Sequence, residues 1–289
     1  MIHTFYTLSN CCFKVEGEEL VQLLSKEEAF KPFEGGSEEG KIFEIHYSSS
    51  RTIFSLEDTL FEHTGEDFYF SFSRIEGSGG YFAQIITDNG EETSLWREGE
   101  DSVLFLQGAI SSFAVSFLLR VGFGLITNTM GRIAIHGSCV VKEGNAYLFL
   151  GESGIGKSTH SRLWIENIEN TFLLNDDSPI IHYDGEEVWI YGSPWSGKTP
   201  CYKNERYPLK GCARITQAPH NKIVALERVI DMYSAIHPSC PPEFSYEENL
   251  YNGISRTIEG MISSIKVFRL ECLPNEEAAM ISYQALCKE

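Results

Sequence analysis

The sequence predicts an α/β protein in two parts, a mainly β N-terminal domain followed by an α/β domain. Three observations support this fold class. Short runs of aromatic and β-branched residues, separated by turn residues, fill the N-terminal part. From Arg132 onward, apolar strand-like runs alternate with helical segments, as they do in α/β layers. Within this second part, "AYLFLGESGIGKSTHSRLW" (146–164) joins an apolar strand, a glycine-rich loop and a helix.

The N-terminal domain is expected to span residues 1–108. Its clearest strands combine aromatic and β-branched residues, and loops rich in Gly, Asp, Asn and Ser bound them. These predicted strands are 41–49, 67–75 and 81–88.

A helix is expected from about Ala109 to Thr127, close to the boundary between the two domains. The apolar stretch that contains it also carries Gln107 and Arg120. That mixture is more typical of a buried amphipathic helix than of a membrane span. We therefore begin the second domain with this helix, at residues 109–289.

The second domain is expected to be built on a mainly parallel sheet, because its strands and helices alternate. Its predicted strands are 132–141, 146–151, 171–177, 188–193 and 266–272, and its predicted helices are 157–168, 247–265 and 275–289.

The composition narrows the function classes. A net charge of −18 disfavours a general nucleic-acid binder, which needs a basic surface, and disfavours docking on an anionic membrane. The first residues lack the basic and apolar regions of a signal peptide, and the eight cysteines form no CxxC pair. We expect a cytoplasmic protein with reduced thiols. Its oligomeric state is left open, a homo-oligomer included.

The loop that follows the apolar strand at 146–150 fits the pattern G-x-x-x-x-G-K-[ST] without a mismatch. Its glycines let successive backbone N–H groups point at phosphate oxygens, and the helix after it adds its positive dipole end. Lys157 would reach the β and γ phosphates, and the Ser158 hydroxyl would bind Mg²⁺. The predicted phosphate-binding residues are Gly151, Glu152, Ser153, Gly154, Ile155, Gly156, Lys157, Ser158 and Thr159.

Asp176 and Asp177 end the predicted strand 171–177, just beyond the helix that follows the glycine-rich loop. Neighbouring parallel strands would bring this strand end beside the loop. One carboxylate would hold Mg²⁺ while the other accepts a proton from an attacking hydroxyl. The competing interpretation is a simple polar turn, because "NDDSP" consists of turn-forming residues.

Two further residues are candidates. His136 lies in "AIHGS", between two strand-like runs, and a lone histidine in such a place is more often structural. The loop "YGSPWSGK" (191–198) ends in Lys198, which could contact phosphate or be an ordinary exposed lysine.

Taken together, "HGSCVV", "LFLGESGIGKST" and "LLNDD" resemble the HPr kinase/phosphorylase-related kinases, whose catalytic domain is similar to the ATP-dependent phosphoenolpyruvate carboxykinases. The resemblance covers about residues 130–285. It implies a P-loop α/β domain, with Lys157 and Ser158 at phosphate and Mg²⁺. It also implies that the two aspartates supply the catalytic base and a metal contact, and that His136 lines the active site.

The resemblance further implies transfer of the γ-phosphoryl group of ATP to a serine hydroxyl in a protein, a peptide or a small molecule. No stretch of the sequence matches the phosphorylase segment of the bifunctional members, and the N-terminal region gives no clear match to their regulatory domain, so the acceptor is left open. One alternative is a carboxykinase-like enzyme, which would need arginines for an anionic substrate, with Arg132, Arg206 and Arg214 as candidates. Another is a nucleotide-binding regulatory protein without turnover.

Overall fold

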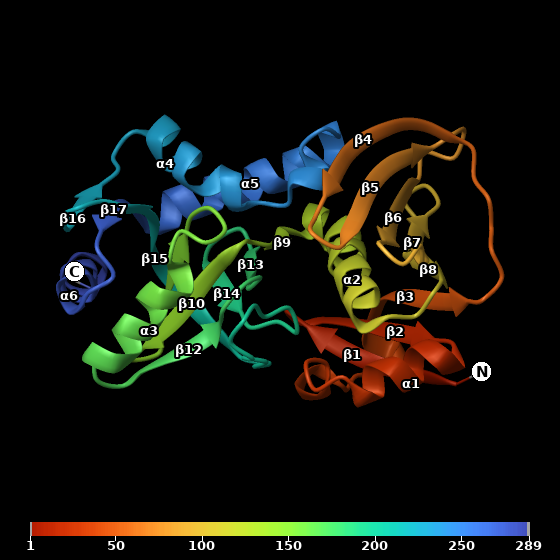
Figure 1. Cartoon of the computed structure of the whole chain (residues 1–289), viewed down its shortest axis with the longest axis horizontal. Helices are drawn as coiled ribbons and strands as arrows, with labels where there is room; N and C mark the ends of the chain where they lie inside the picture. Colours follow the sequence, from red (N-terminus) through yellow and green to blue (C-terminus); the bar gives the residue numbers. More distant parts are fainter. Residues whose placement is uncertain (1, 288–289) are drawn as a thin grey trace. The chain divides into compact units, whose positions relative to one another are not determined.

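The structure is a computed structural model that describes residues 2–287 of the chain. The chain divides into two compact units. Unit 1 comprises the chain up to Thr127 together with Pro242–Tyr251. Unit 2 comprises Asn128–Pro241 and the chain from Asn252 onward. Each unit contains its own large sheet, which can be followed in Figure 1.

Unit 1 holds, among the described residues, an eight-stranded sheet in the order β1-β2-β3-β8-β7-β6-β5-β4. Only the pairs β2–β3 and β3–β8 are parallel, and the remaining neighbours are antiparallel. The strands are β1 (His3–Leu8), β2 (Cys11–Glu16), β3 (Lys41–Ser48), β4 (Leu56–Thr64), β5 (Phe68–Ile75), β6 (Tyr81–Thr87), β7 (Glu92–Arg97) and β8 (Val103–Gly108). The helical segments are α1 (Glu18–Lys26), α2 (Ser112–Thr127), η1 (Lys31–Phe33), η2 (Glu38–Gly40) and η5 (Pro242–Phe244). The predicted strands 41–49, 67–75 and 81–88 correspond to β3, β5 and β6.

Helix α2 packs on the sheet of unit 1. The ring of Phe117 lies 4.9 Å from that of Phe70 on β5, measured between centroids. A Cβ at Gly122 would come within 2.9 Å of Leu104 on β8, so the helix approaches the sheet closely at this glycine. The predicted boundary, which put this helix in the second domain, differs from the observed division at Thr127. The reason is that the apolar face of α2 is buried by the preceding strands.

The segment Ser112–Met130 is long and apolar enough to cross a membrane by length and composition alone. However, 67% of its apolar window is buried inside the protein, which is what a core helix requires. Within unit 1, Arg120 lies over the ring of Phe117, 4.8 Å from its centroid. The helix therefore has the packing of a core element.

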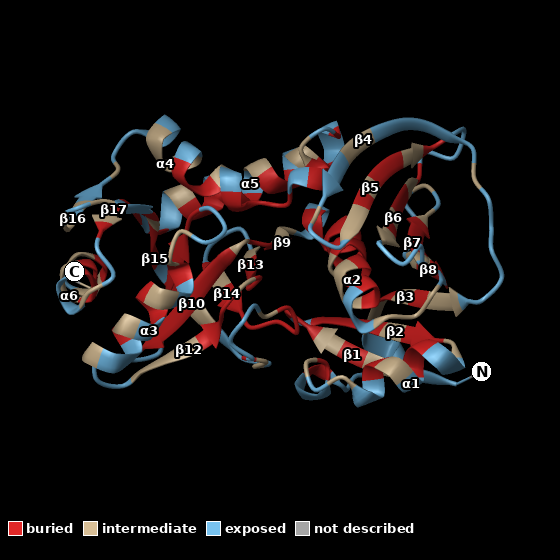
Figure 2. Ribbon diagram, in the orientation of Figure 1, coloured by how far each residue is buried: buried red, intermediate tan, exposed pale blue. Residues whose placement is uncertain are grey.

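Unit 2 holds, among its described residues, a nine-stranded sheet whose main path is β12-β10-β11-β15-β14-β13-β9. Strand β17 pairs with β15, and β16 pairs with β17. The strands are β9 (Arg132–Ala134), β10 (Gly137–Lys142), β11 (Asn145–Leu150), β12 (Thr171–Asn175), β13 (Ile180–Tyr183), β14 (Val188–Tyr191), β15 (Arg206–Gln217), β16 (Lys222–Ala225) and β17 (Lys266–Cys272). Figure 2 shows β10 buried along its length.

The sheet of unit 2 is mixed, and the prediction of a mainly parallel sheet was wrong. Only β11–β15 and β15–β17 are parallel pairs. Strands β10 and β11 form an antiparallel hairpin, and β12 pairs antiparallel with β10. The hairpin arises because Glu143, at φ 50°, and Gly144, at φ 76°, reverse the chain within two residues. The sequence pattern of strands and helices does not reveal this reversal.

The run 132–141 forms two strands, β9 and β10, which meet at His136, the predicted junction between two strand-like runs. The backbone N–H groups of the break leave the ladder for other partners. Those of Ile135, His136 and Gly137 donate to the carbonyls of Pro179 (3.0 Å), Ser239 (2.7 Å) and Asp177 (2.9 Å). Each of these N–H groups is thus satisfied away from the strand direction, and the chain turns from β9 into β10.

The helical segments of unit 2 are α3 (Lys157–Asn167), α4 (Val229–Ile236), α5 (Glu248–Ser264, which begins in unit 1), α6 (Glu276–Cys287), η3 (Asn128–Met130) and η4 (His237–Ser239). Trp164 on α3 is fully buried and packs on Phe149 of β11, with ring centroids 5.3 Å apart. Its indole N–H donates to Ser282 Oγ on α6 at 2.8 Å. Burial of a side chain of this size contributes about 2–3 kcal/mol, so this contact anchors α3 and α6 to the sheet.

Candidate active site

The antiparallel hairpin brings three chain segments to one edge of the sheet in unit 2. Strand β10 lies between β11 and β12 and runs opposite to both, with Gly137 paired to Leu150 and Cys139 to Asn175. The start of β10 therefore lies beside the ends of its two neighbours. His136 precedes β10, the glycine-rich loop follows β11, and Asp176 follows β12. From the sequence we expected β12 directly beside β11, whereas β10 separates them.

The loop Gly151–Gly156 connects β11 to α3 in a conformation that requires glycine. Gly154 has φ 76° and Gly156 has φ 114°, both in the region that side-chain-bearing residues avoid. Helix α3 begins at Lys157, and no side chain caps its N-terminus. Its first N–H groups carry the positive end of the helix dipole, which is the usual arrangement for binding an anion. Glu152, Ser153, Gly154 and Ser158 are exposed, and Ile155 and Thr159 are partly buried.

The ammonium group of Lys157 is buried against the loop. Its Nζ donates to the carbonyls of Gly151 and Glu152, both at 2.9 Å, and lies 2.8 Å from His136 Nε2. Burial lowers the pKa of Lys157, while the negative charges of Asp177 and Glu152 act in the opposite direction. The loop thus holds a positive charge where its backbone curls.

His136 links Lys157 to Asp177. Its Nδ1 lies 3.4 Å from Asp177 Oδ1, while its Nε2 faces the Lys157 ammonium. An ammonium can only donate, so a neutral His136 accepts at Nε2 and carries its proton on Nδ1, toward the carboxylate. Asp177 Oδ2 accepts from Ser178 Oγ at 2.8 Å. A histidine that the sequence left between structural and functional roles therefore bridges two predicted site residues.

Asp176 and Asp177 have different environments. Asp176 is only 6% exposed, and its Oδ1 accepts from Ser138 Oγ at 2.7 Å. Its other oxygen, Oδ2, is buried and has no hydrogen-bond partner among the described residues. Ser158 and Asp176 line one small pocket of about 200 Å³. A carboxylate and a hydroxyl are ligands that Mg²⁺ accepts, so the donor set and the unpaired oxygen fit this cation.

No group of three or more His, Cys, Asp and Glu side chains within residues 2–287 is arranged to hold a metal ion. A site formed by Ser158 and Asp176 would therefore need phosphate oxygens or water to complete its coordination. This is the way in which Mg²⁺ is commonly bound beside nucleotides.

Asn175 holds the backbone of the turn that follows β12 and carries Asp177, a role that we did not predict from the sequence. Its Oδ1 accepts from the backbone N–H groups of Asp177 and Ser178, both at 2.9 Å. Its Nδ2 donates to the carbonyls of Ser193 (3.3 Å) and Trp195 (3.2 Å). An asparagine that bonds the backbone two residues on is a recognised turn former, so the signal was present in "NDD". The polar turn and the carboxylate pair are thus the same feature.

The loop 192–198 lies along the aspartate pair. A Cβ at Gly197 would be 3.1 Å from the Asp176 carbonyl oxygen and 3.4 Å from Asp177 Cβ. Lys198 itself is exposed, and within the described residues it makes no hydrogen bond or ion pair. The structure therefore brings the loop to the site without giving the Lys198 ammonium a partner there.

Arg214 is the arginine that meets the glycine-rich loop. It pairs with Leu150 across β15 and β11, and its guanidinium forms an ion pair with Glu152. The other two candidates lie elsewhere in the sheet. Arg132 donates to the Met130 carbonyl, and Arg206 stacks over Trp189 at 4.6 Å from the ring centroid. Of the three, only Arg214 is at the site, so the arginine cluster expected for a carboxykinase-like substrate is not assembled.

No protein-family model matches this chain, and no curated protein is similar to it. Among solved structures, the chain is similar to the HPr(Ser) kinase/phosphatase from Coxiella burnetii, with 12% sequence identity. The similarity covers 52% of this chain and 90% of that chain, with a TM-score of 0.28. A TM-score this low does not establish a shared fold or function.

Proposed function

We propose that unit 2 is an ATP-dependent phosphotransferase that moves the γ-phosphoryl group of ATP to a hydroxyl of an acceptor. One observation carries the proposal. Four features lie together where β10 begins and where β11 and β12 end. They are the glycine-rich loop with its buried lysine, the histidine that bridges Lys157 and Asp177, and two aspartates that differ in burial. Phosphoryl transfer depends mainly on positioning and charge neutralisation, and this set of groups can supply both.

The phosphates would bind on the loop Gly151–Gly156 and the start of α3. The uncapped N–H groups of the first helical turn and the curled loop backbone offer donors to phosphate oxygens. Lys157 would exchange its loop carbonyl partners for the β and γ phosphates, since a phosphate oxygen carries more charge than a carbonyl. The buried position of its ammonium favours this exchange, because an anion offsets the cost of burying a charge.

Asp176 and Ser158 would hold Mg²⁺. Asp176, whose Oδ2 is unpaired, and Ser158 line the same small pocket, and the ion would neutralise charge on the β and γ phosphates. Ser138 donates to Asp176 Oδ1 and itself contacts Ser161 at 2.6 Å, which fixes the carboxylate in one orientation.

Asp177 would act as the base. It is half-exposed, so an acceptor hydroxyl can approach it, and its contact with His136 orients the carboxylate. The acceptor oxygen forms a bond to the γ phosphorus as the bond from phosphorus to the β–γ bridging oxygen breaks. The hydroxyl proton passes to Asp177, and ADP leaves. The acceptor class is a serine-type hydroxyl in a protein, a peptide or a small molecule.

The test is a turnover assay with purified protein, Mg²⁺ and γ-labelled ATP. Free serine, a mixture of serine peptides and a cell extract serve as separate acceptors. We expect label transfer that Lys157→Ala abolishes, because this change removes the charge that orients the phosphates. Lys142→Ala is the matched control, since Lys142 is equally buried but lies at the opposite end of β10.

Isothermal titration of Mg²⁺-ATP accompanies the assay. Binding that is lost in Lys157→Ala but kept in Lys142→Ala supports the phosphate site. Tight binding without transfer to any acceptor would favour a nucleotide-binding regulatory protein instead. Equal binding by the wild type and Lys157→Ala would contradict the proposal.

A further inference from the structure

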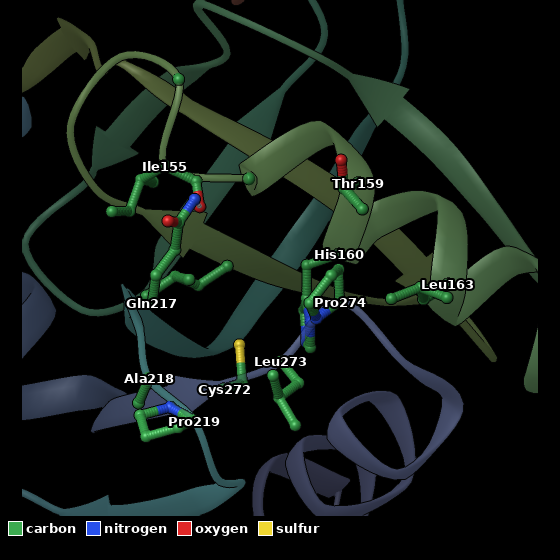
Figure 3. A pocket seen from close by; sticks show the side chains of 13 residues that line it. Ile155, Thr159, His160, Leu163, Gln217, Ala218, Pro219, Cys272, Leu273 and Pro274 are labelled. Carbon is green, nitrogen blue, oxygen red and sulfur yellow. Dashed lines mark hydrogen bonds between the residues drawn. The ribbon is translucent and has the colours of Figure 1, made fainter.

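A second pocket, of about 610 Å³, adjoins the glycine-rich loop, and neither Lys157 nor the two aspartates line it. The loop contributes Ile155 and Gly156 to its wall, and α3 contributes Thr159 and Leu163. The opposite wall comes from the segments that follow β15 and β17 (Figure 3). Strands β11, β15 and β17 are successive parallel neighbours, so all three end at this edge of the sheet. Ligands of α/β sheets commonly bind beyond such strand ends.

The lining of the pocket suits a flat, uncharged group. Apolar side chains make up most of it, including those of Ile155, Leu163, Ile215 and Leu273. A phosphate would lose its hydration in such a place and find no positive charge in return. A heteroaromatic ring would instead bury apolar surface, which is favourable. The volume lies within the range of pockets that bind small molecules, about 300–1,000 Å³. A nucleotide whose phosphates lie on the loop could therefore place its base here.

The backbone of the far wall has few donors to offer. The N–H of Ala218 donates to the Cys272 carbonyl at 3.2 Å, and that of Leu273 donates to Asn221 Oδ1 at 2.9 Å. The neighbouring residues on both segments are prolines, Pro219 and Pro274, which have no N–H. None of these four backbone nitrogens therefore offers a free N–H to a ligand.

His160, on the α3 side of the pocket, has its donor already engaged (Figure 3). Ser282 Oγ donates its proton to the Ala279 carbonyl at 2.9 Å, so it must accept from Trp164 Nε1 and from His160 Nε2. The proton of the neutral His160 ring is therefore on Nε2, and Nδ1 is an acceptor.

Gln217 also presents an acceptor to the pocket, which it lines next to Ile155 (Figure 3). Its Nε2 donates to the Ile155 carbonyl at 3.2 Å, which fixes the orientation of the amide. Oε1 is then the group that Gln217 offers to a ligand, and it is an acceptor. Adenine presents an amino donor at the position where guanine presents the O6 acceptor.

We propose that this pocket is a purine-base site that selects adenine, with Gln217 as its specificity-determining residue. The proposal rests on the phosphate site proposed above. The Gln217 amide oxygen accepts a hydrogen bond from the exocyclic amino group. The ring lies among Ile155, Leu163 and Leu273, and the triphosphate extends from there onto the loop.

Equilibrium binding of ATP, GTP and inorganic tripolyphosphate to the full chain tests the assignment. The affinity for tripolyphosphate measures binding to the loop alone, whereas the affinities for the two nucleotides also include the contribution of the pocket. For the wild type we expect ATP to bind more tightly than GTP and than tripolyphosphate. Gln217→Leu should weaken ATP about tenfold, the effect of one good hydrogen bond, and leave tripolyphosphate unchanged. Thr216→Val, on the neighbouring exposed position outside the pocket, is the control and should change neither.

A second variant, Leu163→Trp, fills the pocket from α3 and should weaken ATP at least tenfold without affecting tripolyphosphate. Gln217 is exposed, so its variant keeps the test valid if Leu163→Trp does not fold. Equal affinity of all three ligands, or ATP binding unchanged in both variants, would overturn the base site while the phosphate site stands. Tighter binding of GTP than ATP would overturn the choice of adenine. Failure of all three to bind would overturn the phosphate site, and this inference with it.

Discussion

Two buried polar side chains, one in each unit, differ in whether all of their hydrogen-bonding atoms have partners. Gln107, on β8 of unit 1, uses both ends of its amide on one residue. It accepts from the Thr52 N–H at 2.7 Å and donates to the Thr52 carbonyl at 3.0 Å. Asp176 in unit 2 is buried to the same degree, yet one of its carboxylate oxygens has no partner among the described residues.

This difference distinguishes a buried polar group that stabilises the fold from one whose burial suits the binding of a ligand. A buried amide whose donor and acceptor both have partners has a structural role, which here is to hold the loop at Thr52. A buried carboxylate oxygen without a partner costs about 1–3 kcal/mol or more, and a bound cation would remove that cost. Unit 1 thus offers control residues for unit 2, where the same kind of change should affect chemistry as well as stability.

The largest effect is expected from Asp177→Asn. Loss of the proposed base should lower the turnover number about 10²- to 10⁴-fold. ATP affinity should change little, because the proposed role of Asp177 is to take the proton of the acceptor hydroxyl and not to bind phosphate. Steady-state kinetics and titration of Mg²⁺-ATP measure the two effects. If Asp176→Asn alone gives this phenotype, the roles of the two aspartates are reversed.

Asn175→Ala should affect both stability and activity. It leaves the N–H groups of Asp177 and Ser178 without their partner and should lower the free energy of unfolding by about 3 kcal/mol. Turnover should also fall, because the aspartates lose their orientation. Gln107→Ala is the matched change in unit 1 and should cost about 1 kcal/mol with turnover intact. Chemical denaturation and the turnover assay test the pair, and equal turnover in the two variants would contradict a positioning role for Asn175.

Acid should destabilise unit 2 through His160. Burial lowers the pKa of His160 from 6.5 to about 4. The unfolded chain then binds a proton below about pH 6.5, whereas the folded chain resists protonation down to about pH 4. The stabilisation is therefore present above pH 6.5 and is lost as the pH falls toward 4, by up to about 3 kcal/mol.

His160→Phe keeps the aromatic contact with Phe149 and removes the titrating group. Its free energy of unfolding should fall less steeply between pH 6.5 and 4 than that of the wild type, by denaturant titration at each pH. The residual slope is expected from other groups, among them His182, whose pKa burial also lowers to about 4. Parallel curves for variant and wild type would rule out the contribution of His160.

The smallest effect is expected from the ion pair at the loop. Arg214→Gln leaves Glu152 as an unopposed negative charge beside the proposed phosphate site and should weaken ATP about fivefold at low salt. Glu152→Gln should act in the opposite direction, and the double variant should bind nearly as the wild type does. Arg74→Gln, which breaks the Arg74–Glu247 pair of unit 1, is the control. A loss with Arg214→Gln that persists in the double variant would indicate direct contact between Arg214 and the nucleotide.

Short segments of the sequence determined much of the local structure. The glycine-rich loop and α3 could be predicted because Gly154, Gly156 and the residues around them are contiguous, and local backbone preference suffices. Helix α5 followed from its apolar spacing, and β3, β5 and β6 from their β-branched and aromatic residues. Even the turn at Asn175 was encoded locally, in a side chain whose length suits a bond to its own backbone two residues on.

Only the tertiary structure decided how these pieces meet. Strand pairing depends on contacts between residues far apart in the chain, so the antiparallel placement of β10 between β11 and β12 was not visible in the pattern. That placement brings His136 to Lys157 and gives Asp176 and Asp177 different degrees of burial. It took the long-range β11–β15–β17 pairing to bring Arg214 and Gln217 to the loop. The sequence by itself thus predicted a glycine-rich loop between a strand and a helix, while the arrangement of the candidate site around it arose from packing.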